Sequence, residues 1–168
     1  MTELDEVDRR RGRPWLVVAL SAVAIAAVTT AGVLGWEVRG QRAVADAERQ
    51  AMAAAQQYAV ILTRVDAATL DLNFAAVLDG ATGEFKDMYS QSSSHLRQAL
   101  VDNNAHADGT VIAAGIRSAT ADTVEVMLFV DQSVTNASNP QPRLDRNRIV
   151  ITMQKIDGRW LASDVDML

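Results

Sequence analysis

The sequence of 168 residues contains no cysteine, only two histidines and only three prolines. Without cysteine there is no disulfide, no thiolate nucleophile and no cysteine-ligated zinc site. The histidines, His95 and His106, have no second histidine or glutamate beside them at the spacing of a metal site. We therefore expect no metal and no cofactor, and a domain that depends on side-chain packing alone for its stability.

Residues arranged for acid–base catalysis are also scarce. The three acids that resemble a catalytic set each lie near an expected helix terminus, where a carboxylate usually caps the helix or faces water: Asp66, Asp71 and Asp79. One catalytic alternative stays open, in which acid–base residues meet inside the fold. Its members would be Tyr58, Tyr89, Asp66 and His95. No spacing requires this arrangement, so the protein is predicted not to be an enzyme.

Charged residues are absent from residues 15–36, and this stretch sets the expected topology. As a helix it spans about 33 Å, close to the roughly 30 Å of a bilayer core, and Trp15 and Trp36 stand at its ends, where indole rings favour the membrane interface. The run is too long for a secretory signal and ends without a good cleavage site, so an uncleaved transmembrane anchor is the better interpretation. Two lines of small residues, which an alanine-rich span also produces by chance, would let another helix pack closely: Ala22, Ala26 and Thr30, and Ala27, Ala31 and Gly35.

Arginines are distributed unevenly about this span. Four precede it, at positions 9, 10, 11 and 13, whereas only Arg39 and Arg42 follow it closely. The positive-inside rule then makes residues 1–14 a cytoplasmic tail and places residues 37–168 outside an inner (plasma) membrane that the chain crosses once. Residues 1–36 hold as many acids as arginines, so the net charge of −5 belongs to the extracytoplasmic part. An acidic domain argues against nucleic acid as a partner.

Hydrophobic periodicity places helices before strands. Residues 37–62 are expected to form a helical stalk and the first domain helix, and residues 63–168 the remainder of the domain. Two shorter helices should end near Gly80 and Val101, the first opening on the capping-box spacing Thr63-Arg-Val-Asp66 and the second on Thr82. A period of two then predicts strands over 110–118, 122–131, 148–156 and 159–163, with a polar loop over 132–147 and a hairpin turn at Asp157-Gly158. Helices followed by a strand meander indicate an α+β domain whose helices pack on one face of an antiparallel sheet.

Two features of the predicted strands leave alternatives open. Trp160 is expected to anchor the core, the alternative being that its ring lines a lipid pocket. Arg143, Arg146 and Arg148 form a small basic cluster, which is either a solvated flank of a hairpin or a contact for lipid headgroups or an acidic partner.

Several short motifs resemble those of the Mce-associated membrane proteins of actinobacteria, small single-span proteins that work with mammalian-cell-entry (Mce) lipid importers. The resemblance covers residues 15–168 and is carried by Leu62-Thr63-x-x-Asp66, Leu70-Asp71, Val77-Leu78-x-Gly80-Ala81-Thr82-Gly83-x-Phe85 with Tyr89, Val130-Asp131-Gln132, and Asp157-Gly158-x-Trp160-Leu161-x-Ser163-Asp164. Within these motifs, structural roles are expected for Gly80, Thr82, Gly83, Phe85, Gly158 and Trp160. Members of the family often carry an aromatic residue where this chain has Arg64-Val65.

The resemblance implies a cone-shaped domain similar to nuclear transport factor 2, in which helices wrap a curved antiparallel sheet, a plan shared with type IV secretion assembly factors. It further implies a non-catalytic accessory role in fatty-acid or sterol import. The implied partners are Mce transporter subunits or their permease and membrane lipids, and self-association is compatible with it. Two alternatives are a periplasmic lipid-binding shuttle, whose cone holds an apolar ligand, and a secretion-type assembly scaffold of the same fold.

Overall fold

The computed structural model describes the course of the chain over residues 14–168 and the side chains of residues 39–168. The chain divides into two units, residues 1–41 and residues 42–168, and helix α1 (Pro14–Thr63) begins in the first and ends in the second. Where side chains are described, no helix is long and apolar enough to cross a membrane. The expected span of residues 15–36, with Trp15, Trp36 and the small-residue positions between Ala22 and Gly35, lies outside those residues and stays a prediction.

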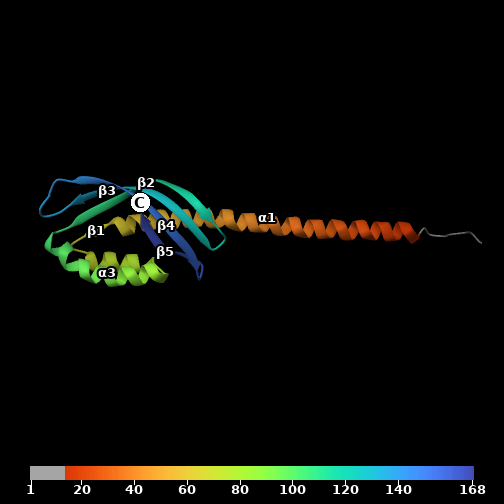
Figure 1. The fold of residues 1–168 in the computed structure, drawn as a ribbon, viewed down its shortest axis with the longest axis horizontal. Coiled ribbons are helices and arrows are strands. Elements are labelled where there is room, and N and C mark those ends of the chain that lie inside the picture. Colours follow the sequence, from red (N-terminus) through yellow and green to blue (C-terminus); the bar gives the residue numbers. More distant parts are fainter. Residues whose placement is uncertain (1–13) are drawn as a thin grey trace, which may run out of the picture. The chain divides into compact units, whose positions relative to one another are not determined.

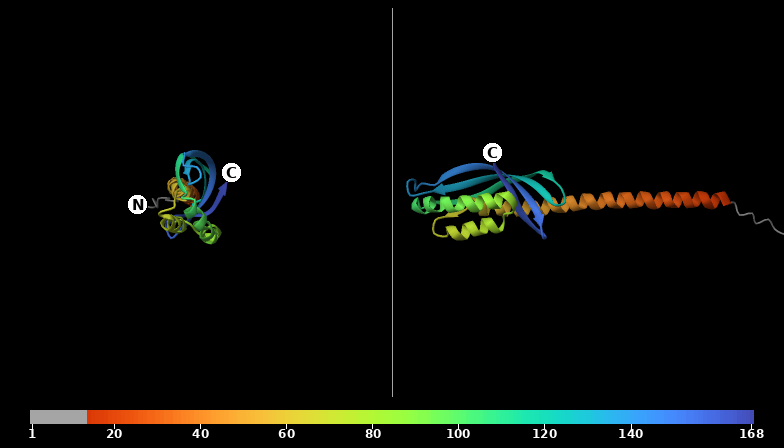
Figure 2. Two further views of the ribbon diagram at one scale, coloured as in Figure 1. Left: turned by 90° about the vertical axis from the view of Figure 1, so that its left-hand side faces the viewer. Right: turned by 60° about the horizontal axis from the view of Figure 1, so that its bottom comes forward.

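The second unit is an α+β domain, as the order of periodicities predicts (Figure 1). After α1 come β1 (Val65–Asp66), α2 (Leu70–Asp79), α3 (Gly83–Asp102), β2 (His106–Ala119), β3 (Thr123–Thr135), β4 (Arg143–Ile156) and β5 (Arg159–Met167). The strands form one antiparallel sheet in the order β1-β2-β3-β4-β5. Figure 2 shows this sheet curling around the C-terminal part of α1, with α2 and α3 beyond it. Helices therefore cover one face of the sheet.

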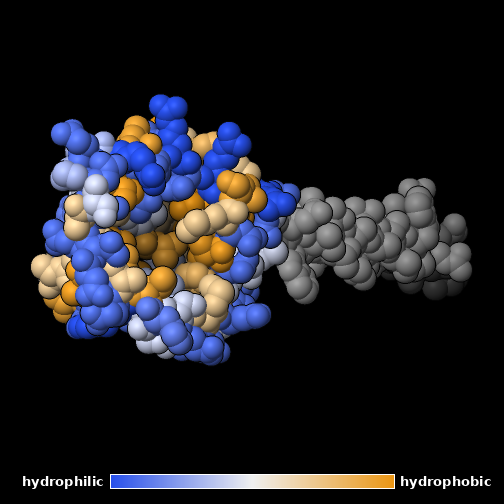
Figure 3. All heavy atoms as spheres, turned by 60° about the vertical axis from the view of Figure 1, so that its left-hand side comes forward, coloured by the Kyte–Doolittle hydropathy of each residue, from blue (hydrophilic) through white to orange (hydrophobic). Residues whose placement is uncertain are grey.

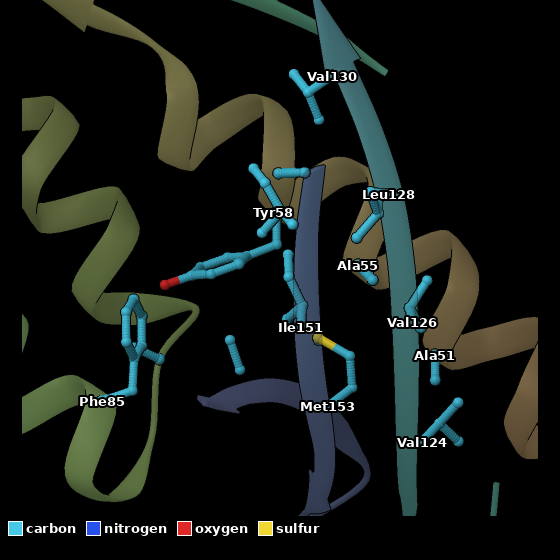
Figure 4. Close-up of a cluster of buried hydrophobic side chains, with 14 of the residues drawn as sticks. Ala51, Ala55, Tyr58, Phe85, Val124, Val126, Leu128, Val130, Ile151 and Met153 are labelled. Carbon is cyan, nitrogen blue, oxygen red and sulfur yellow. The ribbon is translucent and has the colours of Figure 1, made fainter. Parts of the chain in front are cut away.

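The covered face of the sheet carries the aliphatic core. From Val124 to Val130, every second residue of β3 is fully buried (Val124, Val126, Leu128 and Val130), and Ile149, Ile151 and Met153 of β4 lie beside them. Helix α1 meets these strands through an alanine at nearly every fourth position, Ala47, Ala51, Ala55 and Ala59 (Figure 4). Alanine brings the helix backbone close to the sheet, so few gaps remain. Burying each Val, Leu or Ile side chain stabilises the fold by about 1.5–3 kcal/mol.

Several boundaries differ from the expected ones. Strand β3 reaches Thr135 and β4 begins at Arg143, so the polar loop is shorter than residues 132–147. Cross-strand pairing from Val134↔Arg143 onwards extends the hairpin. Exposed strand ends tolerate polar side chains, and the hydrophobic periodicity therefore predicts a loop at these residues. Strand β2 likewise begins at His106, which pairs with Thr135.

The capping box at Thr63 does not form, and that expectation is wrong. The Thr63 hydroxyl donates to the carbonyl of Ala59 at 2.6 Å, one turn back in α1. Residues 65 and 66 then pair with β2 as strand β1, and the Asp66 carboxylate accepts a hydrogen bond from the amide of Ala68 at 2.9 Å. Helix α2 starts only at Leu70. A strand pairing across the fold therefore overrides the local helix-start signal.

Candidate functional site

The space between α1, α2 and α3 is filled by aromatic rings rather than left open for a ligand. The rings of Tyr58 in α1 and Phe85 in α3 meet edge to face, with their centroids 6.4 Å apart. The ring centroids of Phe85 and Tyr89 lie 5.9 Å apart. The Tyr58 hydroxyl donates to the carbonyl of Val77 at 3.0 Å. Figure 4 shows Tyr58 reaching from α1 toward Phe85, past the strand residues of the core. This packing disfavours a cone that encloses an apolar ligand.

The residues of the open catalytic alternative are only partly brought together. Tyr58 and Tyr89 share the aromatic cluster, and burial raises the pKa of both phenols, with the nearby Tyr89 adding to the shift of Tyr58. Both therefore stay protonated at neutral pH. His95 instead lies exposed on α3, where its Nδ1 contacts the carbonyl of Gln91 at 2.9 Å, and Asp66 serves the turn before α2. Within residues 39–168, no three His, Asp or Glu side chains converge closely enough to hold a metal ion.

Two of the candidate acids tie elements together. Asp71 of α2 accepts two hydrogen bonds from Arg97 of α3, at 2.8 and 2.7 Å, and Asp79 at the end of α2 pairs with Arg159 of β5 at 2.7 Å. In each pair, the hydrogen bonds from the guanidinium group are the main cause that lowers the carboxyl pKa. These acids are ionised and paired, so they act as surface links between α2 and its neighbours.

The residues of the most specific motif join α2 and α3 to the edge of the sheet. The amide of Thr82 donates to the carbonyl of Ala162 in β5, and the amide of Ala162 donates to the carbonyl of Gly80, both at 2.8 Å. A side-chain atom added at Gly80 would lie 2.6 Å from the Tyr58 ring, so this corner requires glycine. Thr82 precedes α3, although its side chain makes no capping bond, and Gly83 has a positive φ of 58°. Phe85 is buried. The residues of this motif therefore have structural roles at the corner where α2 and α3 meet β5.

The second motif forms the hairpin between β4 and β5. Asp157 and Gly158 both have positive φ, 50° and 82°, as a two-residue turn of this type needs. Trp160 is only half buried and packs against the edge of the core. Its Nε1 donates to Gln50 at 3.3 Å, and the Lys155 ammonium lies 5.7 Å from the ring centroid. The expectation of a core anchor thus holds only in part, because the ring also faces polar side chains.

The outer face of the sheet, opposite the helices, carries two adjoining grooves of about 500 and 380 Å³. They share Ala113 and Phe129, and Phe129 is 42% exposed. Ile112, Arg146 and Arg148 complete much of the larger groove. We call this surface, formed by the outward side chains of β2–β5, the outer sheet face. Of the predicted basic cluster, Arg143 pairs with Asp145 at 2.7 Å, which leaves Arg146 and Arg148 on the groove.

A second apolar surface lies on the helices. Leu72 of α2 is 73% exposed and Leu96 of α3 is 55% exposed, and these two leucines flank the Asp71–Arg97 ion pair in sequence. Met88, two turns before Leu96 on α3, is also exposed. We call these three residues the helical face. Figure 3 shows one side of the domain, with polar residues over most of the surface and apolar residues gathered about a central hollow.

Sequence reasoning did not identify either surface. The alternation of β3 already separates Met127 and Phe129 from the buried valines, which is a signal for a second, uncovered face. Leu72 falls off the apolar stripe of α2, and that mismatch is the corresponding signal there. Leu96 has the spacing of the stripe that begins at Phe85 on α3 and is expected on that apolar face, so its exposure of 55% departs from the expectation.

Comparison with known proteins gives a family and a fold. The model of a family described as "Uncharacterized protein Rv1363c/MT1408-like" matches residues 15–168. The uncharacterized protein Rv1362c of Mycobacterium tuberculosis is 29% identical over 124 residues, which are 73% of this chain and only 56% of that relative. The outer membrane protein Rv1973 of the same organism is 28% identical over 148 residues, 88% of this chain and 92% of the relative.

Among solved structures, an IcmL-like type IV secretion system protein from Legionella pneumophila matches with a TM-score of 0.59 and 8% identity, over 71% of this chain and 91% of that one. The periplasmic domain of DotI matches with a TM-score of 0.57 and 11% identity, over 70% and 91%. At such low identity these likenesses concern the fold alone. The helices packed on a five-stranded antiparallel sheet are thus an architecture shared with IcmL-like domains.

Proposed function

The chain belongs to the Rv1363c/MT1408-like family, and we propose that it is a non-catalytic accessory subunit of an Mce-type lipid (fatty acid or sterol) import complex. In this proposal, residues 15–36 anchor it in the inner membrane with its N-terminus in the cytoplasm. The acidic domain outside the membrane stabilises or assembles the complex by contacting transporter subunits or their permease. Its task is to hold other proteins in place.

The observation that carries this proposal is the filled interior of the domain combined with its exposed apolar surface. Tyr58 and Phe85 occupy the centre of the fold, which favours a binding protein over an enzyme or a lipid carrier. The apolar side chains that do reach the surface include Leu72 and Leu96 on the helical face. Large apolar side chains exposed to this degree are candidates for burial in a protein contact.

Further support comes from the sequence motifs and the relatives. The motifs resemble those of Mce-associated membrane proteins and include the Gly80–Phe85 segment. A relative named an outer membrane protein and a fold shared with the periplasmic domain of DotI both favour a membrane-associated protein with its domain outside the cytoplasm.

A second candidate function is favoured by the fold. The IcmL-like neighbour is a type IV secretion system protein, so a scaffold for assembling a secretion-type complex is the alternative within the same class. A periplasmic lipid-binding shuttle is the less favoured alternative, because aromatic side chains occupy the position of an internal pocket.

Affinity purification from native membranes tests the proposal. The full chain, tagged at one end and expressed in an actinobacterial host, should recover Mce subunits or their permease after mild detergent extraction, as identified by mass spectrometry. Recovery of secretion components instead would favour the scaffold, and a lone monomer with bound lipid would favour the shuttle. Either result contradicts the proposal.

A matched pair of variants assigns the contact to a surface. Leu96→Asp places a charge on the helical face and should abolish recovery of the transporter, because burying an unpaired carboxylate is costly. Ile112→Asp, at a residue 61% exposed on the outer sheet face, should leave recovery unchanged. Equal recovery with both variants would show that the helical face is not the contact.

A further inference from the structure

The outer sheet face has an apolar centre that the strand register defines. Phe129 pairs with Ala113 on one side and Arg148 on the other, and Met127 pairs with Gly115 and Val150. The two rows thus run side by side across β2, β3 and β4. At Gly115 an added side-chain atom would meet nothing within 4 Å, so this part of the face is open. The centre is therefore apolar and shallow, and Phe129 is its most exposed large apolar side chain, whereas Val150 is buried among its neighbours.

Charges of opposite sign lie on the two sides of a line that crosses the strands between Phe129 and Met127. On one side, Arg146 and Arg148 of β4 are exposed, and Arg148 shares the row of Phe129. On the other side, Asp166 shares the row of Met127 and Val150, Asp164 pairs in register with Thr152, and both acids are exposed on β5. Within residues 39–168 none of these four side chains makes a salt bridge; the pairs formed there involve other residues. The face is thus polarised, with unpaired charges of both signs.

We propose that the outer sheet face binds a second copy of this chain, with the two sheets packed face to face. The two copies are related by a two-fold axis. This axis lies in the plane of the interface and crosses the strands between Phe129 and Met127. A two-fold interface must be complementary to itself, and this axis reverses the order of the rows. The row of Arg148 then meets the row of Asp166, and the row of Arg146 meets that of Asp164. Phe129 of each copy packs over Met127 of the other.

The other charges of the face are compatible with this arrangement. Asp131 pairs in register with Arg146, and the axis sets it opposite the row of Arg117 and Glu125. Those two residues already pair at 3.7 Å, so no uncompensated acid faces Asp131. Aligned packing of two twisted sheets at about −30° leaves the rows close enough for these long side chains to meet.

The size of the face fits a dimer. Four strands about 4.8 Å apart, with roughly eleven residues each, present an area near 19 by 36 Å. This approaches the roughly 800 Å² per partner of a standard protein interface. A membrane surface is a poorer occupant, because anionic lipid headgroups would be repelled by Asp164 and Asp166. A single-chain lipid would occupy the apolar centre and leave those acids without a partner.

The absence of cysteine allows a direct crosslinking test. Packed sheets lie about 10 Å apart, beyond the reach of a disulfide, so a short bismaleimide is the suitable reagent. In the full chain in native membranes, Met127→Cys should give a covalent dimer on a denaturing gel. Leu72→Cys, equally unique and more exposed but on the helical face, should stay monomeric. Unchanged thermal unfolding of both variants confirms that they fold.

Charge reversal provides the second arm, with Met127→Cys present in every chain. Arg148→Asp and Asp166→Arg should each lose most of the crosslinked dimer, because like charges then face each other. Coexpressing these two variants with different tags should restore a crosslink between the two tagged chains. Only contact between copies predicts this rescue, since neither chain changes internally when they are mixed.

Three results would overturn the proposal. One is a monomer with Met127→Cys, and another is equal crosslinking of Met127→Cys and Leu72→Cys. The third is a Met127→Cys product with a different protein or with lipid in place of a second copy. None of them bears on the recovery of Mce subunits through the helical face, so this proposal and the proposed function fail separately.

Discussion

A methyl group at Gly80 should destabilise the domain strongly, and this effect follows from one contact. Gly80 ends α2 with φ −86° and ψ 0°, a conformation that alanine adopts readily. Any cost is therefore steric. The added Cβ would lie 2.6 Å from both Cδ2 and Cε2 of the Tyr58 ring, closer than carbon atoms approach. Because Tyr58 is buried and bonded to Val77, the ring cannot simply turn aside.

Two costs and one gain set the magnitude. Overpacking of a core by a methyl group costs about 1–3 kcal/mol, and displacement of the Tyr58 hydroxyl from the Val77 carbonyl costs about 1 kcal/mol more. Alanine also restricts the unfolded chain more than glycine does, and this offsets about 0.4–1 kcal/mol of the lost stability. We therefore expect Gly80→Ala to lower the free energy of unfolding by about 1–3.5 kcal/mol.

Gly115→Ala is the matched control, because its Cβ would meet nothing within 4 Å. It should be neutral or slightly stabilising. Denaturant titration of the full chain in detergent, followed by circular dichroism, measures both variants against the parent. If Gly80→Ala costs no more than Gly115→Ala, the packing of Tyr58 against the α2–α3 corner described above is wrong.

Three further predictions follow. Gly109→Ala should also lower the free energy of unfolding, by about 1–3 kcal/mol, because its Cβ would clash with the Thr63 side chain where α1 crosses β2; a neutral result in the same titration would refute that crossing. Arg97→Gln should reduce the loss of stability on acidification: the pKa of Asp71 is lowered by Arg97, so the stabilisation is present above the unfolded pKa of about 3.8 and is lost as pH falls below it. Parent and variant should differ at neutral pH and converge in strong acid, and parallel curves would contradict the pairing. Tyr58→Phe should weaken the loss of stability above about pH 10, because burial raises the pKa of the folded phenol and only the unfolded phenol then ionises; an unchanged alkaline limb would argue against burial of that hydroxyl.

Much of the architecture is predictable from sequence periodicity. The alternation of β3 identifies its buried valines, and Asp157-Gly158 identifies the final hairpin, because both signals are local. Local signals fail where distant segments pair. The polar start of β4 is a strand only because Val134 lies opposite Arg143, and Thr63 does not cap α2 because residues 65 and 66 join β2.

The candidate surfaces were harder to predict for a related reason. The sequence assigns Phe129 and Met127 to one face of β3, but which face the helices cover is decided by tertiary packing. The basic cluster looks uniform in sequence, yet Arg143 is neutralised by Asp145 two residues away, while Arg146 and Arg148 remain on the groove. Charge pairing of this kind depends on side-chain directions that a residue count does not contain.

The central claim is that this chain holds other membrane proteins in place through the surface of a filled domain. Purification of the tagged full chain from native membranes, with mass spectrometry of what accompanies it, tests that claim most directly. We expect Mce subunits or their permease with the parent chain and with Ile112→Asp, and their loss with Leu96→Asp. Recovery of the parent chain without any transporter subunit would contradict it.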